Sequence, residues 1–153
     1  MRSYFTPNPV FSQTSVVDGV VYFGATDFSV YALNAHTGAK VWSYKTDSTI
    51  YFSSPAVANG VIYIGSDDDR VYALNARCGA LLWEYVTGGE VESSPSVANG
   101  MVYIGSDGYN LYAFSLPDSD QRSRQGFGRP SLNTLHSDLS MKVSNRLATA
   151  GHD

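Results

Sequence analysis

The chain repeats itself at an interval of about 41 residues, and this repeat restricts the possible folds more than any other feature of the sequence. Gly19 and Gly60 are 41 residues apart, and Gly60 and Gly100 are 40 apart. Aligned on these glycines, the three copies read GVVYFGATDFSVYALN, GVIYIGSDDDRVYALN and GMVYIGSDGYNLYAFS. A second block, SSPAVAN, returns 40 residues later as SSPSVAN. Self-similarity at ~40 residues indicates a helical or a β repeat architecture.

The residue types favour β structure over helices. The runs VIYI (61–64) and VY (71–72) are β-branched and aromatic, which suits a pleated and buried surface. A helical repeat would need apolar residues at a 3.6-residue period, and that period is missing. Asn59-Gly60 is a hairpin signal, because both residues tolerate positive φ. The pattern predicts four strands in the second unit, at 55–58, 61–65, 71–75 and 81–85.

Four antiparallel strands per repeat form the blade of a β-propeller. We therefore predict an all-β fold with two full blades and most of a third, either as an open arc or as part of a larger propeller. The expected organisation is a lead-in at 1–11, propeller repeats at 12–116 (copies at 12–45, 53–86 and 94–116) and a polar tail at 117–153. The tail is rich in Gly, Pro, Ser and charge and poor in β formers, so it is expected to be disordered.

Charge and composition exclude some functions. The net charge is −4, and residues 1–116 hold five Lys or Arg against ten Asp or Glu. Affinity for phosphates comes largely from Lys and Arg, so nucleic acid is not an expected partner. No run of ~20 apolar residues predicts a membrane span. Residues 1–10 lack the apolar core of a signal peptide. The only cysteine, Cys78, cannot form an intrachain disulfide, so the compartment stays open.

The motif AlaLeuAsn…Gly…Trp, at 32–42 and again at 73–83, resembles the tryptophan-docking motif of pyrroloquinoline-quinone (PQQ)-type repeats. That family includes the quinoprotein alcohol dehydrogenases and the β-propeller lipoprotein of outer-membrane protein assembly. The resemblance covers residues 12–114, and it is specific because the motif occurs together with the SerProAlaVal…AsnGly strand pair. It suggests an extracytoplasmic location, although the sequence itself leaves the location unknown.

The resemblance implies that each tryptophan packs against the motif turn of the neighbouring blade. The residues expected to form this structural docking arrangement are Trp42, Trp83, Gly38, Gly79, Ala32 and Ala73. This chain departs from the motif at three points. Cys78 stands where Thr37 does, Ser115 replaces the asparagine of the third copy, and that copy has neither its Gly nor its Trp after Leu116.

The same resemblance would allow PQQ as a cofactor. Quinoprotein dehydrogenases of the family carry an adjacent cysteine pair and an acidic base with calcium ligands. One cysteine cannot supply the pair, and no motif here matches the rest. We expect no cofactor and no catalytic residues, and PQQ is possible only by family resemblance.

Asp67, Asp68 and Asp69 form the densest group of carboxylates and are the weak candidates for a metal site. Clustered oxygen ligands suit calcium. However, aspartate is also common in hairpin turns, where it bonds to nearby backbone amides. The other copies keep only Asp27 or Asp107-Gly108 at this turn. The turn interpretation is therefore favoured, and no metal site is predicted.

Three functions remain open from the sequence. The favoured one is a non-catalytic module that serves as a protein-binding scaffold, with either a protein partner or self-association through open blade faces. The alternatives are a fragment of a PQQ-dependent dehydrogenase whose catalytic residues lie elsewhere, and a truncated piece of a larger propeller gene. Enzyme activity is left open but not expected.

Overall fold

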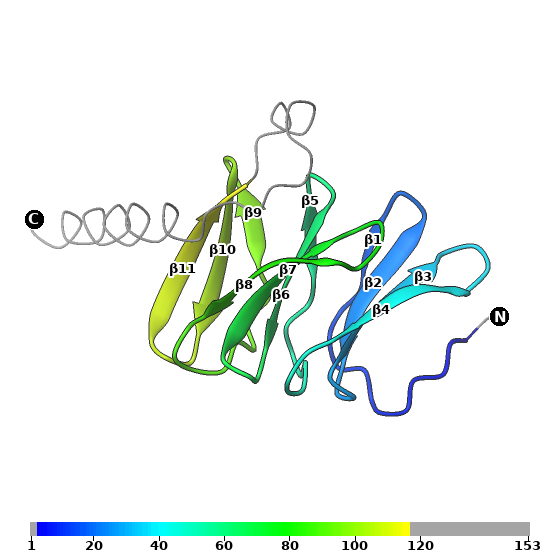
Figure 1. Cartoon of the computed structure of the whole chain (residues 1–153), viewed down its shortest axis with the longest axis horizontal. Helices are drawn as coiled ribbons and strands as arrows, with labels where there is room; N and C mark the ends of the chain where they lie inside the picture. Colours follow the sequence, from blue (N-terminus) through cyan, green and yellow to red (C-terminus); the bar gives the residue numbers. More distant parts are fainter. Residues whose placement is uncertain (1–2, 117–153) are drawn as a thin grey trace, which may run out of the picture.

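Eleven strands form along residues 3–116, the part of the chain that the computed structural model describes (Figure 1). In chain order they are β1 (Ser15–Val17), β2 (Val20–Ala25), β3 (Ser29–Asn34), β4 (Lys40–Lys45), β5 (Ala56–Ala58), β6 (Val61–Ser66), β7 (Arg70–Asn75), β8 (Leu81–Val86), β9 (Ser96–Ala98), β10 (Met101–Ser106) and β11 (Asn110–Ser115). The predicted polar tail at 117–153 lies outside the described residues.

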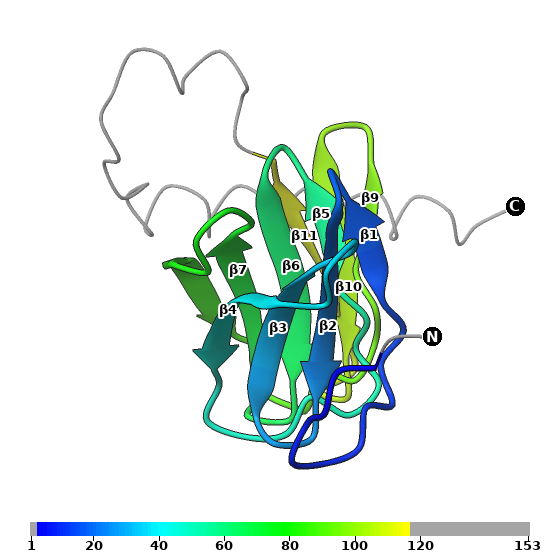
Figure 2. The ribbon, with the colours of Figure 1, turned by 90° about the vertical axis from the view of Figure 1, so that its right-hand side faces the viewer.

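The strands form three antiparallel sheets in which each strand pairs with its neighbours in sequence. Blade 1 is β1–β4, blade 2 is β5–β8, and blade 3 holds β9–β11. The blades follow one another in chain order, side by side from right to left in Figure 1 and one behind another in Figure 2. The predicted all-β fold with two four-stranded blades and most of a third is confirmed. The first strand of blade 2 begins one residue later than expected, because Pro55 has no N–H to donate to a ladder.

Each first hairpin turns on two residues of positive φ. Asn59 and Gly60 have φ of 49° and 69°, as the hairpin signal predicted. The same pair of positions has positive φ in the other blades, at Asp18-Gly19 and Asn99-Gly100. These turns bring the short first strand onto the second strand in every blade, so the three copies share one register.

The core consists of apolar layers between neighbouring blades rather than one central core. The layer between blades 1 and 2 contains Tyr22, Val30, Ala32, Trp42, Ile50, Ile62, Ile64, Tyr72 and Leu74. Blades 2 and 3 enclose a second layer that includes Val61, Tyr63, Ala73, Val102, Val71, Val91 and Ile104. All six residues of β6 are buried, as expected for a strand that is covered on both faces.

Glycines in the second strands make room for the connectors that join the blades. A Cβ on Gly24 would lie 2.2 Å from Ile50 Cγ2, and one on Gly65 would lie 2.3 Å from Val91 Cγ1. Ile50 and Val91 are both fully buried. A larger residue at either glycine would push the connector off the blade that it must cover.

A row of serines links the inner ends of the blades. The first serine of each copy accepts a hydrogen bond from the glycine amide of the second strand, in the pairs Ser12–Gly24, Ser53–Gly65 and Ser93–Gly105 (3.0, 2.8 and 2.9 Å). The following residues bridge the blades. The Gln13 amide donates to Ser54 Oγ (2.8 Å), and the Ser54 amide donates to Ser94 Oγ (3.0 Å). We call this row the serine ladder.

Residues 3–11 of the lead-in form no strand, but they contact blade 1 in the way that a connector contacts the next blade. The Thr26 amide donates to the Pro9 carbonyl at 3.1 Å. The Asp67 and Asp107 amides donate to the connector carbonyls of Thr49 and Glu90 in the same manner, at 3.0 and 2.9 Å. The ring of Tyr4 also lies edge-on to Tyr31.

Candidate functional site

The motif turn of blade 2 is fixed by one asparagine and one glycine. Asn75 Oδ1 accepts hydrogen bonds from the backbone amides of Arg77 and Cys78, at 2.9 and 3.3 Å. The Gly79 amide donates to the Asn75 carbonyl at 2.8 Å, and Gly79 has a φ of 72°. Asparagine is favoured in such turns because its short side chain bonds to nearby backbone amides.

Trp42 of blade 1 lies on this turn. Its Nε1 donates to the Ala76 carbonyl at 3.0 Å, and a Cβ on Gly79 would lie 2.6 Å from Trp42 Cε3. The side chain is 8% exposed. On its own blade it stands opposite the fully buried Ala32. The ring therefore needs glycine above it and alanine beside it.

The equivalent turn of blade 1 has the same backbone but a different environment. Gly38 has a φ of 74°, close to that of Gly79. Within residues 3–116, however, no heavy atom other than those of Gly38 and its two chain neighbours lies within 4 Å of the position where a Cβ on Gly38 would be. The two turns therefore have nearly the same backbone conformation, and they differ in that an indole ring covers Gly79 but no ring covers Gly38.

Trp83 packs less completely than Trp42. Its ring lies 5.0 Å from Phe114 of blade 3 and 5.9 Å from Tyr63 of its own blade, and the residue is half-buried. It stands opposite Ala73, which is fully buried. The turn that would receive Trp83 follows Leu116, so this part of the expected docking falls outside the described residues.

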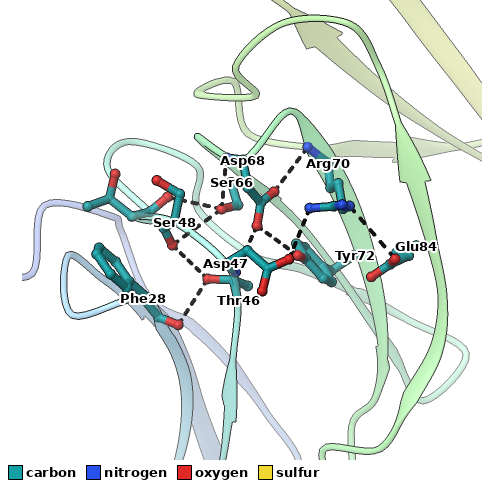
Figure 3. Close-up of polar contacts among 10 residues, drawn as sticks. Phe28, Thr46, Asp47, Ser48, Ser66, Asp68, Arg70, Tyr72 and Glu84 are labelled. Atoms are coloured by element: carbon teal, nitrogen blue, oxygen red, sulfur yellow. Dashed lines mark hydrogen bonds and ion pairs between the residues drawn. The ribbon is translucent and has the colours of Figure 1, made fainter.

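Asp67, Asp68 and Asp69 each accept hydrogen bonds from different partners (Figure 3 shows the contacts of Asp68). Asp67 accepts a hydrogen bond from the Thr49 hydroxyl. Asp68 Oδ2 accepts from the Asp47 amide (3.0 Å) and the Tyr72 hydroxyl (2.7 Å). Asp69 has a φ of 64° and uses its backbone carbonyl to accept from Thr87. These contacts fasten the turn to the connectors on either side.

Arg70 closes this polar network at its outer end (Figure 3). Its guanidinium lies 3.2 Å from the Asp47 carboxylate and 3.7 Å from that of Glu84. Partial burial opposes the charge, but the surrounding Tyr72 and the carboxylates outweigh that effect and raise the pKa of Arg70. The arginine thus joins the connector, the third strand and the fourth strand at one point.

A tyrosine–aspartate hydrogen bond recurs at the same turn of blades 1 and 2. Tyr31 donates to Asp27 Oδ2 at 2.5 Å, as Tyr72 does to Asp68. Burial and the hydrogen bond to Asp27 raise the pKa of Tyr31 to about 12, and the same causes raise that of Tyr72. In blade 3 glycine replaces this aspartate, and Tyr112 donates to the Thr87 carbonyl instead.

Within residues 3–116, no three His, Cys, Asp or Glu side chains are gathered so that they could hold a metal ion. The carboxylates at the blade 1–blade 2 junction act as hydrogen-bond acceptors and ion-pair partners. The arrangement links the connector to the strands of blade 2.

The sequence did not predict an exposed aromatic cluster that the lead-in and the connector between blades 1 and 2 form together. Phe11 stacks on Tyr51 with ring centroids 4.8 Å apart, and Tyr51 contacts Phe52 edge-on at 4.5 Å. Phe11 and Phe52 are 51% and 52% exposed. The sequence does carry a signal, because Phe11 and Phe52 both precede the first serine of the ladder, where blade 3 has Glu92.

Glu92, which stands in blade 3 where the other copies have Phe11 and Phe52, is acidic. Burial comes first among the causes that raise the pKa of Glu92, followed by the nearby charges of Asp67, Asp107 and Glu90. Glu92 therefore lies among other acidic side chains.

The sequence profile described as outer membrane protein assembly factor BamB matches residues 26–151. The match extends into the tail, in which the sequence analysis found no fourth copy. No curated protein sequence matches the chain. In the part of the chain that the structure describes, no helix is long and apolar enough to cross a membrane.

Solved propellers share the fold. Quinohemoprotein alcohol dehydrogenase from Pseudomonas putida HK5 is 26% identical over 76% of this chain and 20% of its own, with a TM-score of 0.65. The corresponding enzyme from Comamonas testosteroni is 26% identical over 74% and 20%, with a TM-score of 0.60. A europium-containing methanol dehydrogenase is 22% identical over 75% and 24%, with a TM-score of 0.65. The chain thus spans a fifth to a quarter of these proteins.

Proposed function

The chain belongs to the family of the outer membrane protein assembly factor BamB, and from that premise we propose that it is a non-catalytic propeller module that binds other proteins. The observation that carries the proposal is the aromatic cluster of Phe11, Tyr51 and Phe52. Two of its rings are half exposed, although burying a large aromatic side chain stabilises a protein by about 2 kcal/mol. Exposed apolar patches of this kind mark interaction sites.

The polar groups of the blade junction support the same proposal. The carboxylates of Asp67 and Asp68 accept hydrogen bonds from the connector and the third strand, and Arg70 pairs with the acids on either side. These groups make the junction stiff. A stiff surface binds a partner without the entropic cost of ordering itself first. Like the assembly factor that gives the family its name, this chain would bind its partners outside the cytoplasm, during the assembly of outer membrane proteins.

Site-specific photocrosslinking tests the proposal in the cells that make the protein. A photoreactive residue at Phe52 is expected to give one discrete adduct, which mass spectrometry identifies as a component of outer-membrane protein assembly. The same residue at Leu81, which is 41% exposed on the fourth strand of blade 2, is the control and is expected to give none. Equal labelling at both positions, or no adduct at Phe52, would contradict the proposal.

A second candidate follows from the likeness to the quinohemoprotein alcohol dehydrogenases. In that case the chain would be a piece of a larger propeller that holds PQQ. Titration of the purified chain with PQQ and calcium, followed by absorbance, separates the two candidates. Saturable binding at micromolar PQQ would favour the dehydrogenase piece, whereas the scaffold is expected to show none.

A further inference from the structure

Acidic side chains gather at one end of the blades. Within residues 3–116, the two connectors (46–55 and 87–95) and the turns between the second and third strands hold eight Asp or Glu and no Lys or Arg. These acidic residues are Asp27, Asp47, Asp67, Asp68, Asp69, Glu90, Glu92 and Asp107. Hydrogen bonds from the Asp67 and Asp107 amides hold these turns against the connectors.

The opposite end of the blades has a different balance of charge. The turns there join the first strand to the second and the third to the fourth, and within residues 3–116 they carry one acid, Asp18, and one base, Arg77. The acids of the described part therefore lie mostly at the connector end. A surface with one sign of charge attracts ligands of the opposite sign.

Asp67 connects the aromatic cluster of Phe11, Tyr51 and Phe52 to this acidic end. Its carboxylate accepts a hydrogen bond from the Thr49 hydroxyl, and its amide donates to the Thr49 carbonyl at 3.0 Å. Thr49 precedes Tyr51 by two residues on the same connector. The charge of Asp67 also helps to raise the pKa of Glu92, so these two carboxyl groups lie near each other.

The serine ladder places the aromatic rings and Glu92 in one row. Phe11, Phe52 and Glu92 each come directly before the first serine of their copy. The Ser53 hydroxyl donates to the Ser93 carbonyl at 2.8 Å, which joins the residues that follow Phe52 and Glu92. A ligand that contacts both the rings and the carboxylate must therefore extend across neighbouring blades.

The row has the chemistry that recognises arginine. Phe11 and Phe52 are 51% and 52% exposed, and their ring centroids lie 6.5 Å apart. A guanidinium stacks on aromatic faces and pairs with a carboxylate through two parallel hydrogen bonds, whereas the lysine ammonium has no planar face. Alternate residues of an extended chain point to the same side at intervals of ~6.7 Å, which is close to the separation of the two rings.

We propose that the aromatic cluster and Glu92 bind an extended segment of a partner protein that carries arginine at alternate positions. This proposal rests on the protein-binding function proposed above and specifies the chemistry of the partner. Arginine side chains stack on Phe11 and Phe52, and a further arginine pairs with Glu92. The acids of the turns and connectors attract the segment and speed the encounter.

Fluorescence anisotropy with labelled peptides tests the site on the full chain. The probe is SRSRSRS, with SKSKSKS as the peptide of equal charge and SESESES as the anionic control. Saturable binding of SRSRSRS is expected. SKSKSKS should bind about fivefold more weakly, because lysine lacks the stacking and the paired hydrogen bonds of the guanidinium. SESESES should not bind.

Two variants that remove one negative charge locate the acidic part of the site. Glu92→Gln should weaken the binding of SRSRSRS about threefold, as the loss of one partly exposed ion pair does. Asp18→Asn is the matched control at the opposite end of the blades and should leave binding unchanged. The control preserves the hairpin, because Asn59 and Asn99 occupy this position in the other copies with the same positive φ.

A second pair of variants tests the rings. Phe52→Ala should weaken the binding of SRSRSRS about tenfold and reduce its advantage over SKSKSKS, because the stacking surface is lost. Phe5→Ala, which truncates a phenylalanine of the lead-in that is 87% exposed, should change neither value. A loss of arginine preference is specific to stacking, since a general loss of affinity would affect both peptides equally.

The proposal is overturned if SRSRSRS does not bind, if SKSKSKS binds as tightly, or if Asp18→Asn weakens binding as much as Glu92→Gln. The binding function itself is tested separately by the Phe52 adduct, which forms with a partner of any composition. A chain that forms the adduct and ignores SRSRSRS has the proposed function with a partner of different chemistry. A chain that binds SRSRSRS but forms no adduct has the arginine site without the proposed function.

Discussion

At the scale of single residues, the comparison of equivalent positions separates conformation from packing. Gly38 and Gly79 have nearly the same positive φ, yet only Gly79 lies against an indole ring. Glycine is therefore required at Gly38 for its backbone alone and at Gly79 for its backbone and for the space it leaves. This difference can be measured.

Gly79→Ala is expected to destabilise the chain more than Gly38→Ala. Both variants pay about 1 kcal/mol for a Cβ in the left-handed region. Gly79→Ala must also displace Trp42, which adds roughly 1–3 kcal/mol of overpacking strain. Urea unfolding followed by circular dichroism measures both free energies. Equal losses would mean that Trp42 does not need the space above it.

The recurring tyrosine–aspartate pairs predict a loss of stability at alkaline pH. The pKa of Tyr31 is raised from 10.0 to about 12 in the folded chain, so the folded state holds this proton more tightly than the unfolded state. Its contribution is complete below pH 10 and is lost as the pH rises towards 12. The free energy of unfolding, measured by urea titration, should fall across that window.

Tyr31→Phe should make the alkaline fall shallower, because the proton that links folding to pH is removed. Tyr109→Phe is the control, since it makes the same change at a tyrosine that is fully exposed. A Tyr31→Phe profile with the same slope as the parent would assign the alkaline loss to other groups.

At the scale of strands and connectors, the sequence predicted the strands well, because the repeat places the same hairpin signals in each copy. The run of four apolar residues at 61–64 indicated a buried strand, and β6 is fully buried. The serine ladder was not predicted. Ser54 and Ser94 lie 40 residues apart, and only the stacking of blades brings the hydroxyl of one to the amide of the other.

The aromatic cluster escaped the sequence analysis for a similar physical reason. Phe11 and Tyr51 lie 40 residues apart, on the lead-in and on the connector between blades 1 and 2, and neither takes part in the strand pattern from which the fold was inferred. The variation between the three copies indicated that Asp67, Asp68 and Asp69 form a hairpin turn. Their hydrogen-bond partners on the connectors could not be predicted, because these partners lie far away in the sequence. Local sequence patterns therefore predict the strands, but they do not predict the side-chain contacts between residues of different repeats.

The fourth strands should contribute unequally to stability. We predict that Trp42→Ala costs ~3–5 kcal/mol, as truncation of a core aromatic does. Trp83→Ala should cost less, because Trp83 is half-buried and packs on Phe114, whereas Trp42 also donates to the Ala76 carbonyl. Urea melts of the two variants provide the measurement. A larger loss for Trp83→Ala would contradict this ranking.

At the scale of the whole molecule, each blade buries its faces only against its neighbours, so the two ends of the series differ. Blade 1 is met by the lead-in, whose Pro9 carbonyl and Tyr4 ring contact Thr26 and Tyr31. Blade 3 presents Leu111 to solvent in the described part of the chain. Repeat proteins commonly need polar end caps for solubility, and blade 3 has an apolar surface where such a cap would lie.

The chain is therefore expected to associate weakly through blade 3 when no partner is present. Light scattering should show a mean mass that rises with protein concentration. Leu111→Lys should reduce this rise by placing a charge on the uncovered face, while Tyr109→Lys should not, although both variants add the same charge. A mass that stays monomeric at all concentrations would show that blade 3 is not an associating surface, and association that persists in Leu111→Lys would place it elsewhere.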